Sequence, residues 1–271
     1  MKTRHLIILA LIGSFFGFAA AAQNSGLARL TDRDDLLGWE AVGRLDMAGS
    51  GFCTGTLIAP DLVLTAAHCV YHPQSSDPVR PQDLLFRAGL RDGTAIAERS
   101  VLQIAAHPVF NPRTSLNEEN IRHDVALLRL KDPIVSTDAD PFILHSGPAS
   151  GTSVSVVSYG RGRAEALSRQ RRCKIVGSHE DLMAFDCNVT FGSSGAPVFA
   201  HSGSRGRIIS LISGGTVAGG RQLALGMALP EVVDQLKRKL RAEPVVRPNV
   251  TVRRLSVGDN RSGTGAKFVK P

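Results

Sequence analysis

Aromatic residues are scarce in this chain, at 5% of 271 residues, with one tryptophan and two tyrosines. The 27 glycines follow no Gly-X-Y period, and the composition excludes collagen, a coiled coil and wholesale disorder. Four cysteines are too few for a disulfide-dense miniprotein but sufficient for two bridges. Beyond residue 22 no segment is long and apolar enough to span a membrane. What remains is a globular protein with one large domain or two small ones.

The first 22 residues have the composition of a secretory signal peptide. Lys2 and Arg4 precede an apolar run at residues 6–18, and four alanines at 19–22 resemble a cleavage site. We therefore expect residues 1–22 to be removed and the mature protein to be secreted or periplasmic, in an oxidising space. The alternative is an uncleaved anchor helix over residues 6–22, at the short limit for spanning a bilayer.

The positive charge is concentrated at the two ends of the chain. The formal net charge is +8, of which Lys2 and Arg4 contribute +2 and residues 241–271 contribute +5. The body between them is therefore about +1, which does not favour nucleic-acid binding. Residues 242–271 are predicted to form a basic, disordered tail, since they are rich in Gly, Pro, Ser and Asn.

Short apolar runs separated by Gly, Pro, Asp and Ser predict an antiparallel β-sandwich or β-barrel. A proline-bearing stretch at residues 131–148 is a plausible linker between two halves. Pro230 opens a predicted helix over residues 230–241, because four apolar residues fall on one face: Val232, Val233, Leu236 and Leu240.

Three segments carry candidate catalytic residues: LTAAHC at 64–69, HDVALLRL at 123–130 and GSSGAP at 192–197. A serine hydroxyl needs a neighbouring imidazole to accept its proton, and that imidazole needs a carboxylate to fix its tautomer. His68, Asp124 and Ser194 supply these groups. Gly192 and Gly195 permit a tight turn, in which the backbone N–H groups of Gly192 and Ser194 can face an oxyanion.

Each motif alone is ordinary, but in this order they resemble the trypsin/chymotrypsin-like serine proteases, with their TAAHC box, D-[IV]-A-L-L-x-L strand and GDSGGP loop. The resemblance covers residues 39–241, and AVGRL at 41–45, CTGTLI at 53–58 and SYG at 158–160 are typical of its bacterial branch, which includes glutamyl endopeptidases. It implies an all-β fold of two six-stranded antiparallel β-barrels with a C-terminal helix. The first barrel would span residues 39–135 and the second 136–229.

The same resemblance implies how the cysteines pair and what each catalytic residue does. Cys53 and Cys69 match the family's bridge at the histidine loop, which leaves Cys173 and Cys187 for each other. His68 would be the general base, Asp124 the orienting carboxylate and Ser194 the nucleophile of a serine endopeptidase acting on protein or peptide substrates.

Ser193 departs from the family pattern, because trypsins carry an aspartate just before the nucleophile. That aspartate binds the ammonium group freed on activation, and a serine cannot form such an ion pair. We therefore expect no charge latch. The enzyme is expected to be competent either after signal removal or after an N-terminal segment, residues 23–38, is trimmed at Arg29 or Arg33. Ala196 replaces the second glycine of the loop, a mild change.

The specificity pocket is expected to involve Asn188, Ser213, Gly214 and Gly215. Asn188 stands six residues before the nucleophile, where trypsins place an aspartate, so an uncharged or mixed preference is predicted. A loop shift that brings in Asp186 would instead give basic specificity. The run at residues 212–215 lacks the histidine of glutamyl endopeptidases.

The remaining histidines lack metal-ligand spacing, so we expect no metal and no cofactor. A monomer is expected. The alternative to an active endopeptidase is an inactive or latent binding protein on a protease fold.

Overall fold

The computed structural model describes residues 26–49, 51–114, 117–146, 153–200 and 205–243. The predicted signal peptide, residues 1–22, and the predicted tail beyond residue 243 lie outside them. Within these residues, no helix is long and apolar enough to cross a membrane.

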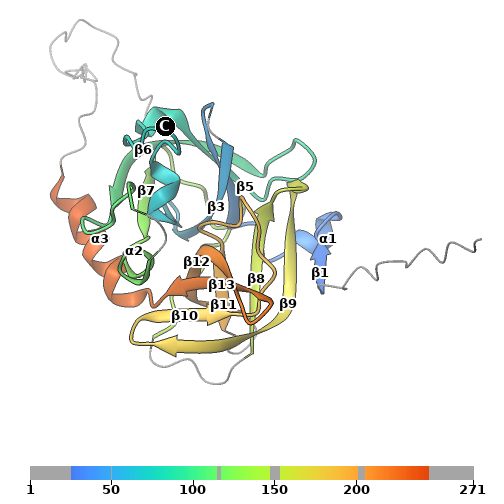
Figure 1. The fold of residues 1–271 in the computed structure, drawn as a ribbon. Coiled ribbons are helices and arrows are strands. Elements are labelled where there is room, and N and C mark those ends of the chain that lie inside the picture. Colours follow the sequence, from blue (N-terminus) through green and yellow to red (C-terminus); the bar gives the residue numbers. More distant parts are fainter. Residues whose placement is uncertain (1–25, 50, 115–116, 147–152, 201–204, 244–271) are drawn as a thin grey trace, which may run out of the picture.

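Six antiparallel strands close the first barrel, in the order β2-β3-β4-β7-β6-β5 (Figure 1). They are β2 (Val42–Met47), β3 (Gly51–Ala59), β4 (Leu62–Thr65), β5 (Leu84–Ala88), β6 (Ala97–Ala106) and β7 (Ala126–Leu130). Three short helical segments interrupt them: η1 (Ala67–Val70), η2 (Pro81–Asp83) and α2 (Glu118–Arg122). The barrel wall packs tightly at Gly43, because an added Cβ there would lie 2.5 Å from the Phe86 ring.

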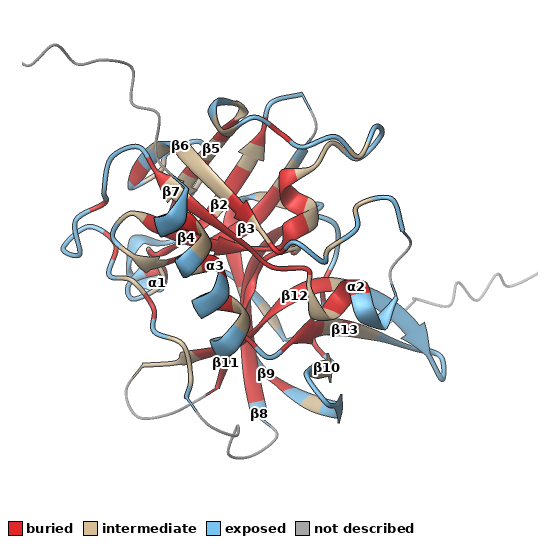
Figure 2. Cartoon of the chain, turned by 90° about the vertical axis from the view of Figure 1, so that its left-hand side faces the viewer, coloured by how far each residue is buried: buried red, intermediate tan, exposed pale blue. Residues whose placement is uncertain are grey.

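The second barrel also has six antiparallel strands, in the order β8-β9-β10-β13-β12-β11, and β11 pairs back with β8. They are β8 (Ser153–Gly160), β9 (Arg163–His179), β10 (Leu182–Phe185), β11 (Pro197–Ala200), β12 (Arg207–Ala218) and β13 (Arg221–Met227). Figure 2 shows the buried residues concentrated along the strands of the two barrels. The predicted fold class is therefore confirmed.

The C-terminal helix α3 (Pro230–Ala242) extends one residue beyond the predicted end. Proline is tolerated at its first turn, where no intrahelical partner exists for the N–H group. Val233, Leu236 and Leu240 are buried, and the helix packs against β6 and β7 of the first barrel (Figure 1). The helix therefore returns from the second barrel to cover the first.

The N-terminal segment is integrated into both halves. Strand β1 (Leu27–Arg29) pairs with β9 of the second barrel, and α1 (Arg33–Leu36) follows it. Leu30 and Leu36 are buried, and Arg29 forms an ion pair with Asp92 of the first half. Trimming at Arg29 would therefore remove the paired strand β1, and trimming at Arg33 would also remove the buried Leu30.

Candidate active site

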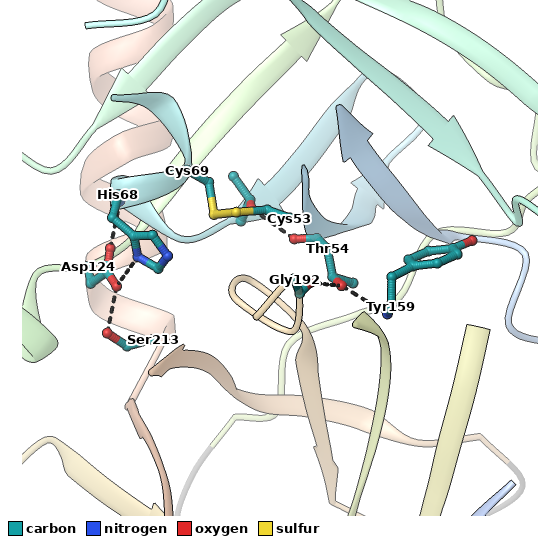
Figure 3. The surroundings of a disulfide bond; sticks show 9 residues. Cys53, Thr54, His68, Cys69, Asp124, Tyr159, Gly192 and Ser213 are labelled. Atoms are coloured by element: carbon teal, nitrogen blue, oxygen red, sulfur yellow. Dashed lines mark hydrogen bonds and ion pairs between the residues drawn. A yellow bond between two sulfur atoms is a disulfide. The ribbon is translucent and has the colours of Figure 1, made fainter. Parts of the chain in front are cut away.

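His68 lies in η1, immediately after β4, on the face of the first barrel that meets the second. A disulfide between Cys53 and Cys69 ties this short helix to β3, with the sulfur atoms 1.99 Å apart (Figure 3). It closes a loop with a sequence separation of 16 residues. Such a loop contributes roughly 3 kcal/mol to stability in the chain-entropy model. The backbone that carries His68 is therefore covalently fixed.

Asp124 lies between α2 and β7, and it is buried, with 1% of its surface exposed. One carboxylate oxygen accepts a hydrogen bond from His68 Nδ1 at 2.8 Å and another from the Ser213 hydroxyl at 2.5 Å. The other oxygen accepts the backbone N–H of His68 at 2.8 Å. A buried carboxylate needs such partners, and these orient the imidazole as well (Figure 3).

The ionisation of His68 reflects two opposing effects. Burial lowers the pKa of His68, whereas the negative charge of Asp124 and its hydrogen bond raise it, and the net pKa lies above the usual value of 6.5. The side chain is still 37% exposed, so the ring remains accessible from outside. The geometry thus combines an oriented imidazole with a solvent-facing edge.

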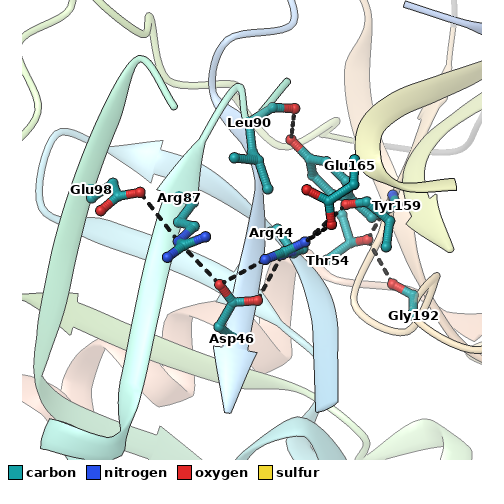
Figure 4. Close-up of polar contacts among 10 residues, drawn as sticks. Arg44, Asp46, Thr54, Arg87, Leu90, Glu98, Tyr159, Glu165 and Gly192 are labelled. Carbon is teal, nitrogen blue, oxygen red and sulfur yellow. Dashed lines mark hydrogen bonds and ion pairs between the residues drawn. The ribbon is translucent and has the colours of Figure 1, made fainter. Parts of the chain in front are cut away.

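The Ser194 turn belongs to the second barrel but is held by Thr54 of the first. The Thr54 backbone N–H donates to the Ser194 carbonyl at 2.8 Å, and its hydroxyl donates to the Gly192 carbonyl at 2.8 Å (Figure 4). Gly195 has a positive φ of 77°, and a Cβ there would lie 2.3 Å from the Thr54 carbonyl oxygen. Glycine is therefore required for the close approach that brings Ser194 to the histidine loop.

Two backbone N–H groups of this turn are left without a hydrogen-bond acceptor among the described residues. The N–H groups of Gly192 and Ser194 donate to no acceptor there. The N–H of Ser193 donates to the Thr190 carbonyl, and that of Gly195 donates to the Ile212 carbonyl. Gly192 has a φ of 92°, which orients its peptide as an L-residue rarely can. The free N–H groups are the pair that the sequence predicts for an oxyanion hole.

The Ser194 hydroxyl itself forms no hydrogen bond with His68 in the part of the chain that the structure describes. Catalytic hydrogen bonds are often long in ligand-free enzymes and shorten in the complex with substrate. The two residues are nevertheless linked by contacts: Gly195 donates to the Ile212 carbonyl, and Ser213 bonds to Asp124. The Ser194 turn thus contacts β12, and the next residue of that strand, Ser213, bonds to the carboxylate that accepts from His68.

The second disulfide joins Cys173 of β9 to Cys187, close to the candidate specificity residues. Asn188 is exposed, and its backbone N–H donates to the Gln170 side chain at 2.7 Å. Asp186 accepts a hydrogen bond from the Lys174 backbone, on the strand β9 side. The Asp186 carboxylate is therefore already engaged by β9.

Ser213, Gly214 and Gly215 lie along β12, where its pairing with β13 shifts register between Ile212 and Gly214. The hydroxyl of Ser213, which we predicted as a substrate-binding residue, donates to Asp124. Gly214 is half-buried and Gly215 exposed. These two glycines are thus the part of the run that remains open to a substrate backbone.

Within the described residues, one cluster has metal-ligand proximity: Cys53, His68 and Cys69, with potential ligand atoms within 4.8 Å of one another. Both sulfur atoms are used in the disulfide. Because a metal needs free thiolates, this cluster offers a single imidazole and does not fit a metal ion.

Three contributors to the site were not predicted: Thr54, the hydroxyl of Ser213, and Arg163, which donates to the Ser193 hydroxyl at 3.0 Å. The available signals were the position of Thr54 beside Cys53 and that of Arg163 just after the SYG motif. Neither signal specifies a partner more than 25 residues away.

Comparison with solved structures identifies the class of fold. The chain resembles a Glu endopeptidase in complex with MPD, with a TM-score of 0.63 and 18% identity over 80% of this chain and 97% of that one. A thermostable serine protease from an extremophilic microorganism gives a TM-score of 0.62 and 17% identity, over 76% of this chain and 99% of the other. At these identities the likeness establishes the chymotrypsin-like fold.

The sequence profile of the trypsin family matches residues 37–228, more than half of the chain, and the protein therefore belongs to the trypsin family. Serine protease 56 from Homo sapiens is 33% identical over 129 residues, and that from Mus musculus is 32% identical over the same length. The match covers 45% of this chain and 19% of each relative, so it spans about a fifth of their length.

Proposed function

We propose that this protein is a secreted serine endopeptidase that hydrolyses peptide bonds through an acyl-enzyme on Ser194. The observation that carries the proposal is the buried Asp124 carboxylate bonded to His68 Nδ1, beside a turn with two unused N–H groups. Family membership supports protease chemistry. The signal-like N-terminus and two disulfides support export.

In this mechanism, His68 accepts the proton of the Ser194 hydroxyl as the hydroxyl oxygen bonds to the substrate carbonyl carbon. Asp124 keeps the proton on Nδ1, which leaves Nε2 free to act as the base, and it stabilises the imidazolium that forms. His68 then donates the proton to the leaving amine. A water molecule then gives a proton to His68 as its oxygen bonds to the acyl carbonyl carbon. His68 returns the proton to the Ser194 oxygen, and the carboxylic acid product is released.

The developing oxyanion would be bound by the N–H groups of Gly192 and Ser194. Preorganised donors of this kind are worth about 10²- to 10³-fold in kcat each in related acyl-transfer enzymes. Thr54 supports them because it bonds to the carbonyl groups of both residues. The donors are thus held by the first barrel before a substrate arrives.

We further propose that the specificity pocket prefers uncharged side chains. Its candidate residue Asn188 carries no charge, and the neighbouring Val189 is buried, with its carbonyl accepting from Gln222 at 2.7 Å. Asp186 is bonded to the backbone of β9. Cleavage of a peptide library measures this preference, and strict cleavage after Lys, Arg or Glu would contradict it.

A fluorophosphonate probe tests the assembled site without knowledge of the substrate. The oxidised protein should be labelled, whereas Ser194→Ala should not react and His68→Ala should react far more slowly. Ser178→Ala, which changes an exposed serine on β9, should label like the wild type. A folded, oxidised protein that does not react would favour the alternative of a binding protein on a protease fold.

Activity should rise with pH because the base works only as neutral imidazole. Asp124 raises the pKa of His68, so the midpoint of kcat/KM in the acid limb is expected above 6.5. The same interaction favours folding at low pH, and this stabilisation is lost as the pH rises through the raised pKa. A pH profile of kcat/KM from 5 to 9 measures the midpoint, and a flat profile would argue against a histidine base.

A further inference from the structure

Arg163, the first residue of β9, directs a charged side chain toward the turn that carries the proposed nucleophile. Its Nη2 donates to the Ser193 hydroxyl at 3.0 Å and to the Ser158 hydroxyl at 2.9 Å. Its Nη1 donates to the Ser158 carbonyl. The guanidinium therefore bridges the end of β8 and the residue immediately before Ser194.

Ser193 is completely buried, and its hydroxyl uses its full hydrogen-bonding capacity. It donates to the Tyr159 carbonyl at 3.1 Å and accepts from the Thr190 N–H at 3.3 Å and from Arg163. Loss of Arg163 would leave one acceptor position of a buried hydroxyl empty. The position of the Ser193 side chain thus depends on its hydrogen bond with Arg163.

The arrangement is unusual because the cation has no carboxylate partner among the described residues. Burial alone lowers the pKa of Arg163 to about 10, so it remains charged at neutral pH. Gly160 makes room for it, since an added Cβ there would lie 2.9 Å from the guanidinium carbon. Arg163 is half-buried, and a cation that is partly removed from water without a carboxylate partner is costly, which points to a function beyond packing.

We propose that Arg163 is a positioning residue that holds the Gly192–Ser194 turn in its donor-ready conformation through the Ser193 hydroxyl. This inference rests on the proposed protease function. Because the contact lies within the second barrel, the turn needs no freed amino-terminal ammonium. The first described strand, β1, instead pairs with Ser168–Gln170 of β9.

Replacement of the cation tests the proposal. Arg163→Met should lower kcat about 10²-fold, the scale of losing one oxyanion-hole donor, while KM changes less than about threefold. Arg163→Lys retains the charge without the planar fork and should recover part of the lost kcat. Arg169→Met is the matched control, because Arg169 lies on the same strand but stacks on Trp39. It should retain the wild-type kcat.

A second set of variants keeps the test valid if Arg163→Met does not fold. Ser193→Ala should lower kcat by about tenfold or more, since the bond to Arg163 is lost. Ser193→Asp gives the guanidinium a carboxylate but loses the bond donated to the Tyr159 carbonyl, so it should lower kcat less than Ser193→Ala does. The double variant Ser193→Asp with Arg163→Lys should have a kcat similar to that of Ser193→Asp alone. In the double variant Ser193→Asp with Arg163→Met, the loss of kcat should be far larger than the two single losses combined.

Extension of the mature amino terminus by a few residues should leave kcat unchanged, because no ammonium is used. A folded Arg163→Met with wild-type kcat, an effect on KM alone, or an equal loss in Arg169→Met would overturn the inference. A fall in kcat on extension would overturn it too. If the wild type neither cleaves peptides nor reacts with the fluorophosphonate, the proposed function fails first.

Discussion

Ser194→Ala should reduce kcat by about 10⁶-fold, the scale measured when the nucleophile of a related triad is removed. The structure explains why the loss should fall on chemistry and leave the fold intact. The turn is held by backbone groups, as in the bond from the Thr54 N–H to the Ser194 carbonyl, and alanine retains these. The melting temperature should therefore be nearly unchanged.

Residual activity in Ser194→Ala is informative in its own right. With the N–H groups of Gly192 and Ser194 still present, turnover should exceed the uncatalysed rate by about 10³- to 10⁴-fold. Steady-state hydrolysis of a peptide substrate measures both quantities, with Ser178→Ala as the control that changes an exposed serine. Turnover within tenfold of wild type in Ser194→Ala would remove the assignment of the nucleophile.

The parts of the fold that could be predicted are those with local signals. Pro230 and the spacing of Val233, Leu236 and Leu240 predicted α3 to within one residue at its end. Short apolar runs predicted strands, and the family resemblance supplied the closure into barrels. By contrast, the pairing of β1 with β9 joins residues more than 130 positions apart. No sequence pattern near residue 27 indicates such a partner.

The residues of the candidate site likewise fall into those that local motifs predict and those that only the structure reveals. His68, Asp124 and Ser194 stand in motifs whose neighbours single them out as candidates, and the structure shows the bonds between His68 and Asp124. Thr54, Arg163 and the hydroxyl of Ser213 act through hydrogen bonds to residues far from them in the sequence. A threonine or serine in a strand has many possible partners, so only the three-dimensional arrangement selects one.

Asp124→Asn is the second substitution with a large expected effect. It should lower kcat about 10⁴-fold, as the same change does in the Ser-His-Asp triad of a well-studied serine protease. The carboxylate accepts on both sides: from His68 Nδ1 and Ser213 through one oxygen, and from the His68 N–H through the other. An amide has one oxygen and one NH₂ group. Whichever way it lies, one donor of His68 then faces another donor.

If the amide oxygen keeps the backbone N–H, its NH₂ group faces Nδ1, which must then accept. The ring proton moves to Nε2, where it blocks the base needed by Ser194. Ser213→Ala is the matched control, because it removes one bond and keeps the carboxylate, so it should lose far less activity. Peptide hydrolysis at pH 8, with thermal unfolding to verify the fold, measures the difference. A folded Asp124→Asn within tenfold of wild type would show that the carboxylate does not set the tautomer of His68.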